Sequence, residues 1–178
     1  MTLSTVLSFV LIPALAGVAL ADSFNLYAYG DGIGGLPLHY ADGAAVISQG
    51  KPENATDTDV VSFTTSDGSL VGNPNATSTN PPFSDQLLSI PGPESTSHEI
   101  GFVNGTSSPP ADVVVNKFVW YGHTLLVQND EGEFTSLFSV RKSDGAEKDY
   151  SLFWNVTDGS DDGDVITISM RSIGPSTD

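Results

Sequence analysis

The sequence contains no cysteine, and only six of its 178 residues are lysine or arginine. Without cysteine the protein cannot use disulfides, thiolate zinc sites or a thiol nucleophile, so packing alone must stabilise its fold. The 22 acidic residues bring the formal net charge to −16, which opposes binding to nucleic acid and to anionic membrane surfaces. We interpret this charge as an acidic, soluble surface, in preference to a site for a specific cationic ligand.

Long apolar segments are scarce, and the longest lies at the N-terminus. An apolar run over residues 6–18 follows the polar start MTLST, and Ala19-Leu20-Ala21 matches the cleavage pattern of secretory signal peptides. The run is too short to span a bilayer comfortably. We therefore predict a signal peptide over residues 1–21 and one secreted domain over residues 22–178. The polar C-terminus RSIGPSTD has no hydrophobic tail, so we expect no membrane anchor.

Helical periodicity is also missing after the signal sequence. Short β-branched and aromatic runs alternate instead with turn signals such as ADG, NDEG and SDG. This pattern predicts an all-β fold, an antiparallel β-sandwich or jelly roll of about eleven short strands. Two stretches rich in Asn, Pro, Ser and Thr, residues 65–85 and 104–112, are expected to be long exposed loops. The predicted strands cover residues 24–29, 37–41, 44–49, 60–64, 86–91, 98–103, 113–121, 123–128, 134–140, 149–156 and 164–171.

The segment GDGIGG, residues 30–35, contains the G-x-G-x-x-G spacing of dinucleotide-binding loops. That function requires a helix directly after the glycines, because the pyrophosphate binds at the helix N-terminus. Here a strand-like segment, LPLHY, follows instead, and Asp31 would repel phosphate. We predict that residues 30–35 connect two β-strands, that no helix begins at Gly35, and that no nucleotide cofactor binds.

Four sequons for N-glycosylation indicate a secreted glycoprotein. The sequon at Asn155 falls within the predicted strand 149–156. If Asn155 faces outward, strand alternation turns Trp154 toward the core, which agrees with the apolar pattern. The four asparagines are Asn54, Asn75, Asn104 and Asn155.

The acidic run DGSDDGD, residues 158–164, is the best metal candidate in the sequence. Asp158, Ser160 and Asp162 alternate as in the first half of a calcium-binding loop, but Ser169 stands where an EF-hand needs a bidentate glutamate. The run is therefore either a weak Ca²⁺ site or a solvated hairpin turn. The three histidines have no metal-ligand spacing, and we expect exposed or hydrogen-bonded structural roles for them; they are His39, His98 and His123.

Motifs for catalysis are missing as well. The chain has no G-x-S-x-G elbow and no α/β pattern that would hold one. A pair of carboxylates for glycoside hydrolysis could come from any strands, and the sequence selects none. We therefore predict no catalytic residue; the glutamates open to such a role are Glu99, Glu131, Glu133 and Glu147.

Aromatic side chains offer a possible binding surface. Tyr27 and Tyr29 share one face of the first predicted strand, and a tyrosine pair at this spacing can stack on sugar rings. The alternative is ordinary sheet covering, because aromatic residues favour strands. Trp120 and Tyr121 are expected on opposite faces of their strand. The face of the first strand opposite the tyrosines carries Phe24, Leu26 and Ala28.

The segments FNLYAYG, GLPLHYADG, FVWYG and LFWN…VITISMRS together resemble a group of small secreted, cell-wall-like proteins of filamentous fungi. The resemblance covers most of the chain after residue 21. It implies a fungal source, secretion and a β-rich fold. The matching residues include no catalytic set, so the resemblance transfers no active site.

These observations lead to one functional expectation and two alternatives. We expect a secreted, non-enzymatic glycoprotein that acts at the fungal cell wall or a host surface by binding glycans or a host protein. The first alternative is an extracellular polysaccharide hydrolase that uses paired carboxylates. The second is a structural component of the cell wall.

Overall fold

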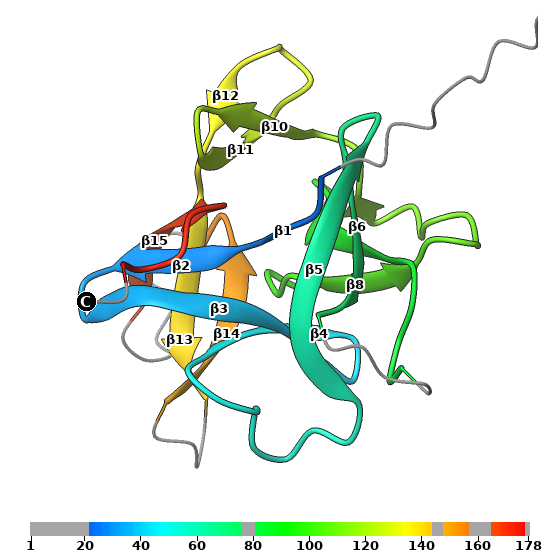
Figure 1. The fold of residues 1–178 in the computed structure, drawn as a ribbon. Helices are drawn as coiled ribbons and strands as arrows, with labels where there is room; N and C mark the ends of the chain where they lie inside the picture. Colours follow the sequence, from blue (N-terminus) through cyan, green and yellow to red (C-terminus); the bar gives the residue numbers. More distant parts are fainter. Residues whose placement is uncertain (1–21, 76–80, 144–147, 157–164, 177–178) are drawn as a thin grey trace, which may run out of the picture.

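The computed structural model describes residues 22–75, 81–143, 148–156 and 165–176, which form fifteen β-strands and no helix (Figure 1). The first eight are β1 (Phe24–Asn25), β2 (Tyr27–Gly30), β3 (Ile33–Ala41), β4 (Ala44–Ser48), β5 (Thr58–Ser66), β6 (Ser69–Pro74), β7 (Gln86–Pro91) and β8 (Gly101–Asn104). The others are β9 (Val113–Val114), β10 (Phe118–Tyr121), β11 (Thr124–Gln128), β12 (Phe134–Thr135), β13 (Phe138–Lys142), β14 (Asp149–Trp154) and β15 (Ile166–Arg171). The predicted signal peptide lies outside these ranges. In the part of the chain that the structure covers, no helix could cross a membrane.

The all-β, antiparallel prediction is confirmed, but the strands close into a barrel and do not clearly form a sandwich or jelly roll. Hydrogen-bonded neighbours run β15–β13–β14–β4–β8–β7–β6–β5–β3–β2, and β2 pairs again with β15, which closes a ring of ten strands. In Figure 1, β2 (blue) lies beside β15 (red). The sequence could not predict this closure, because strand alternation is the same in a sandwich and in a barrel.

Two features modify the ring. Strand β3 also pairs with β4, so a hairpin connects two distant points of the ring. Strands β10, β11 and β12 form a small sheet outside it, at the top of Figure 1. This small sheet contacts the ring through the pairing of Thr124 with Arg171.

Strand β6 lies within the stretch predicted as a loop, so that prediction is wrong for residues 69–74. Its Gly72, Asn73 and Pro74 are poor strand formers, which hid the strand from the sequence pattern. Gly72 is needed here because a Cβ atom would lie 2.6 Å from Cγ1 of Val61 and 3.2 Å from the Phe63 ring. Tertiary packing therefore overrides local propensity in this strand.

The core is built from inward-facing aliphatic and aromatic side chains of the ring strands. Leu26, Ala28 and Leu38 are fully buried, as the alternation of the first strands predicts. Trp154 is 9% exposed and packs edge-to-face on Phe138, with ring centroids 4.9 Å apart. The prediction that Trp154 faces the core is therefore confirmed.

The GDGIGG segment forms the β2–β3 hairpin, as predicted, and no helix begins at Gly35. Asp31 and Gly32 make the turn, where Gly32 has a φ of 69°. Gly35 has a φ of 83° and sits at a β-bulge, because Ala28 pairs with Leu36 while Tyr29 pairs with Gly34. The glycines thus serve a tight turn and a bulge, for which left-handed backbone is required.

Candidate functional site

Tyr27 and Tyr29 do share one face of β2, opposite the buried Leu26 and Ala28, and both are half-buried. The C-terminal segment lies against them. Tyr29 donates its hydroxyl proton to the carbonyl oxygen of Ile173 at 2.9 Å, and a Cβ atom on Gly174 would lie 3.0 Å from the Tyr27 ring. The two rings therefore support the C-terminal segment and do not form a bare platform.

A groove of about 380 Å³ lies elsewhere, between the end of β7, the small outer sheet and the end of β14. Its apolar lining comes from five separate elements. Leu137, at the rim, is 43% exposed, whereas Trp154 presents only a small part of its ring. The apolar lining residues include Ile90, Val114, Val127, Leu137 and Trp154.

Polar groups surround this apolar surface. Gln128 and Asn129 line the groove from β11 and the following turn, and His98 lines it from the segment before β8. Nδ1 of His98 lies 3.1 Å from the carbonyl oxygen of Trp154. Because a carbonyl only accepts, Nδ1 donates here, and Nε2 of the neutral ring remains available as an acceptor.

The turn after β11 is held rigid on its own hydrogen bonds. Oδ1 of Asn129 accepts the backbone N–H groups of Glu131 and Glu133 at 3.0 and 2.8 Å. Lys117 and Asp130 form an ion pair of 3.1 Å at the groove, although both side chains are partly or largely exposed. The turn thus places fixed amide and charged groups beside the apolar floor.

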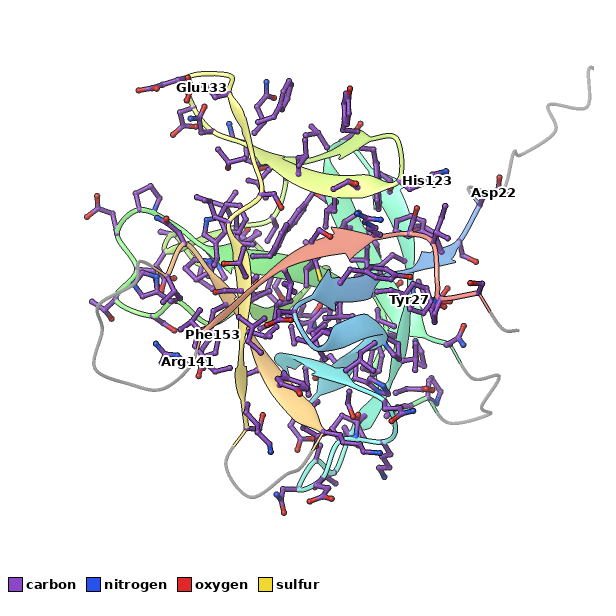
Figure 2. All side chains as sticks on the ribbon, turned by 90° about the vertical axis from the view of Figure 1, so that its left-hand side faces the viewer. Asp22, Tyr27, His123, Glu133, Arg141 and Phe153 are labelled. Carbon is purple, nitrogen blue, oxygen red and sulfur yellow. The ribbon has the colours of Figure 1, made fainter. Side chains whose placement is uncertain are left out.

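Carboxylates do not form an isolated pair at this groove. Among its lining residues within the described ranges, Asp130 is the one acidic side chain, and Lys117 pairs with it. Glu99, Glu131 and Glu133 are exposed, and Figure 2 shows Glu133 at the tip of its turn, apart from the other labelled residues. Glu147 lies outside the described residues.

A smaller cavity of about 180 Å³ holds three acidic residues, Asp42, Glu53 and Asp149. Asp42 accepts the backbone N–H groups of Thr56 and Asp57 at 2.9 and 2.8 Å, and these bonds lower the pKa of its carboxyl group. Asp149 is buried and accepts hydrogen bonds from the Ser48 hydroxyl and the Glu53 backbone. These carboxylates hold loops in place.

The histidines have different environments. His98 and His123 are exposed and each makes a side-chain contact, as expected. His39 differs from the expectation, because it is 4% exposed and neither ring nitrogen reaches a hydrogen-bond partner among the described groups. Burial lowers the pKa of His39; the nearby Ser48 backbone and the charges of Asp59 and Asp149 offset part of this effect.

Within the described residues, no cluster of three or more His, Asp or Glu side chains could hold a metal ion. The predicted weak calcium site at Asp158, Ser160 and Asp162 lies outside those residues. The four sequon asparagines are all exposed, and Asn155 follows the end of β14 with a φ of 51°. Asn155 also lines the groove, so its sequon stands at the groove rim.

A scan of the chain against protein-family models gives no match, and searches of curated proteins and of solved structures also give none. The site is therefore argued from geometry alone. Sequence reasoning missed the groove because its walls come from segments far apart in the chain. The one usable signal was the prediction that Trp154 turns inward.

Proposed function

We propose that the protein is a secreted, non-enzymatic glycoprotein of the cell wall or host surface that binds a saccharide in the groove at Trp154 and Leu137. The observation that supports this proposal most directly is the combination of an apolar floor with fixed hydrogen-bonding groups. The predicted signal peptide and the four exposed sequons support an extracellular location.

Sugars suit such a surface because a pyranose ring has apolar C–H faces and an edge of hydroxyl groups. The ring would lie over Leu137 and Val114, and its hydroxyls would meet the side chains of Gln128, Asn129 and His98. A volume of about 380 Å³ falls in the usual range of small-molecule sites, roughly 300–1,000 Å³. One or two sugar units fit this space.

The hydrolase alternative needs two carboxyl groups separated by about 5 to 9.5 Å across the scissile bond. The described lining of the groove offers Asp130 alone, and the ion pair with Lys117 commits that group. This arrangement favours binding over hydrolysis. A host-protein ligand and a purely structural wall role remain alternatives, and they predict no affinity for isolated oligosaccharides.

Isothermal titration calorimetry of the secreted protein with neutral cell-wall oligosaccharides tests the proposal. Leu137→Asp places a charge on the groove floor, and we expect affinity to fall at least about tenfold, the equivalent of 1.4 kcal/mol. Ile173→Asp is the matched control, because Ile173 is similarly exposed (51% against 43%) but lies outside the groove. Equal losses in both variants, or no binding by the parent protein, would contradict the proposal.

A further inference from the structure

A second hollow, of about 460 Å³, lies beside the C-terminal segment and is separate from the groove. It is lined by Tyr29, His123, Thr124, Arg171 and residues 173–176. Figure 2 shows His123 and Tyr27 on either side of the strand that ends at Arg171. The hollow therefore forms where β2, β15 and the β10–β11 hairpin meet.

Strand register places four side chains in one row across this surface. Tyr121 pairs with Thr124, Thr124 with Arg171, and Arg171 with Tyr27. Directly opposed residues of antiparallel strands point to the same face. Tyr121 is 80% exposed, so the row continues from the hollow onto an open aromatic ring.

Arg171 is the charged group of this surface. Its guanidinium carbon lies 5.2 Å from the centre of the Tyr29 ring. Stacking of this kind uses the flat face of the guanidinium and leaves its N–H edge free to donate hydrogen bonds. Among the described residues, no carboxylate lies within ion-pair distance of Arg171, although the protein has 22 acidic residues and six cationic ones.

The remaining groups of the hollow are neutral donors, acceptors and apolar surface. None of its described lining residues is acidic. Nδ1 of His123 lies 3.3 Å from the Ser172 hydroxyl, and the backbone N–H of Ser172 donates to the carbonyl oxygen of His123 at 3.0 Å. These contacts hold the imidazole beside Arg171. Ile173 adds an exposed apolar side chain at the same place.

We propose that this hollow binds the carboxylate of an acidic saccharide, with Arg171 as the anchoring residue. One guanidinium matches one carboxylate through two parallel N–H···O bonds. A phosphate dianion would keep one charge unmatched here. The hydroxyl groups of Thr124 and Tyr29 and the apolar surface of Ile173 suit the rest of a sugar ring. This site is independent of the groove proposed above.

The net charge of −16 does not prevent such binding. At physiological ionic strength, exposed charges more than about 8 Å away are largely screened, so the groups in the hollow dominate. An acidic sugar would reach Arg171 without an adjacent carboxylate to compete for it. The overall charge instead disfavours long polyanions, so we expect short uronate oligomers to be the ligands.

The test compares a uronate disaccharide with its methyl ester, which differs in charge but hardly in shape. We expect the secreted protein to bind the acid at least about tenfold more tightly than the ester in calorimetric titrations. Arg171→Gln should abolish this preference, and Arg171→Lys should reduce it, because lysine cannot form the two parallel bonds. Equal binding of acid and ester by the parent protein would overturn the proposal.

Three controls separate this result from other causes. Lys148→Gln removes the same charge outside the hollow, where Lys148 contacts Gln49, and should keep the preference. Leu137→Asp should also keep it, since the groove is a different site. Inorganic phosphate should compete weakly; competition as strong as that of the uronate would overturn the saccharide assignment. An unchanged melting temperature of Arg171→Lys shows that the variant is folded, and a retained preference in both Arg171 variants would exclude Arg171 as the anchor.

Discussion

The Ser48 hydroxyl donates a hydrogen bond of 2.6 Å to Oδ1 of Asp149 in the protein interior. The two residues face each other on β4 and β14 and lie 101 positions apart in the chain. The other carboxylate oxygen accepts the backbone N–H of Glu53 at 2.8 Å. One buried carboxylate therefore fastens two strands and the loop that follows β4.

Removing this carboxylate should destabilise the protein strongly. Asp149→Ala leaves the Ser48 hydroxyl and the Glu53 N–H without their acceptor, and we expect the free energy of unfolding to fall by about 3 kcal/mol. Ser48→Ala loses one bond and should cost about 1–2 kcal/mol. Urea denaturation measures both values. The exposed Glu94→Ala is the control, and a loss for Asp149→Ala as small as that of the control would contradict this role.

His39 should make the protein sensitive to mild acid. Burial lowers the pKa of His39 in the folded state, so the folded protein disfavours the charged ring relative to the unfolded chain. Stability is then complete above the unfolded pKa of about 6.5 and is lost as the pH falls below it. We expect the urea midpoint to drop between pH 7.5 and pH 5, and to drop less in His39→Gln. His98→Gln, at an exposed histidine, should retain the full slope; identical slopes in all three proteins would refute the prediction.

Gly35 should tolerate substitution far less well than its neighbour Gly34. A Cβ atom on Gly35 would lie 2.8 Å from the Tyr29 hydroxyl and 2.9 Å from Pro175, at a φ of 83°. Positive φ and the steric clash together should cost about 2–3 kcal/mol in Gly35→Ala. At Gly34 nothing lies within 4 Å of the added atom, so Gly34→Ala should change stability by less than about 0.5 kcal/mol. Thermal unfolding of the two variants decides the matter, and equal melting temperatures would show that the bulge is not constrained.

Secretion should leave a defined chain with glycans attached. We expect the protein recovered from culture medium to begin at Asp22 and to carry N-glycans at Asn54, Asn75, Asn104 and Asn155. Glycopeptide mass spectrometry and N-terminal sequencing measure both properties. A glycan on Asn155 would stand at the groove rim, so its enzymatic removal should increase oligosaccharide affinity. Unmodified sequons in protein from a glycosylating host would contradict the expectation.

The sequence was sufficient for features that depend on neighbouring residues. Alternation placed Leu26, Ala28 and Trp154 inside the core, and the order of strand and glycine excluded a nucleotide loop at residues 30–35. Features that depend on distant residues were out of reach. The pairing of β2 with β15, which closes the barrel, leaves no local trace in either strand.

The candidate sites show the same limit in more detail. Tyr27 and Tyr29 share a face, as predicted, yet the sequence could not show that Gly174 packs against Tyr27. The groove depends on Val114, Leu137 and Trp154, which local patterns assign to unrelated strands. His39 occupies an ordinary strand position in the sequence, and only the packing of the loop after β4 explains its burial.

The central claim is that a saccharide binds against Trp154, and the fluorescence of this residue tests it most directly. The protein has two tryptophans, and Trp120→Phe removes the other while keeping an aromatic ring against Phe24. We expect the emission of this variant to change and saturate with the same dissociation constant that calorimetry gives for the neutral oligosaccharide. Leu137→Asp should shift that titration at least about tenfold. Calorimetric binding without any change in Trp154 emission would contradict the account.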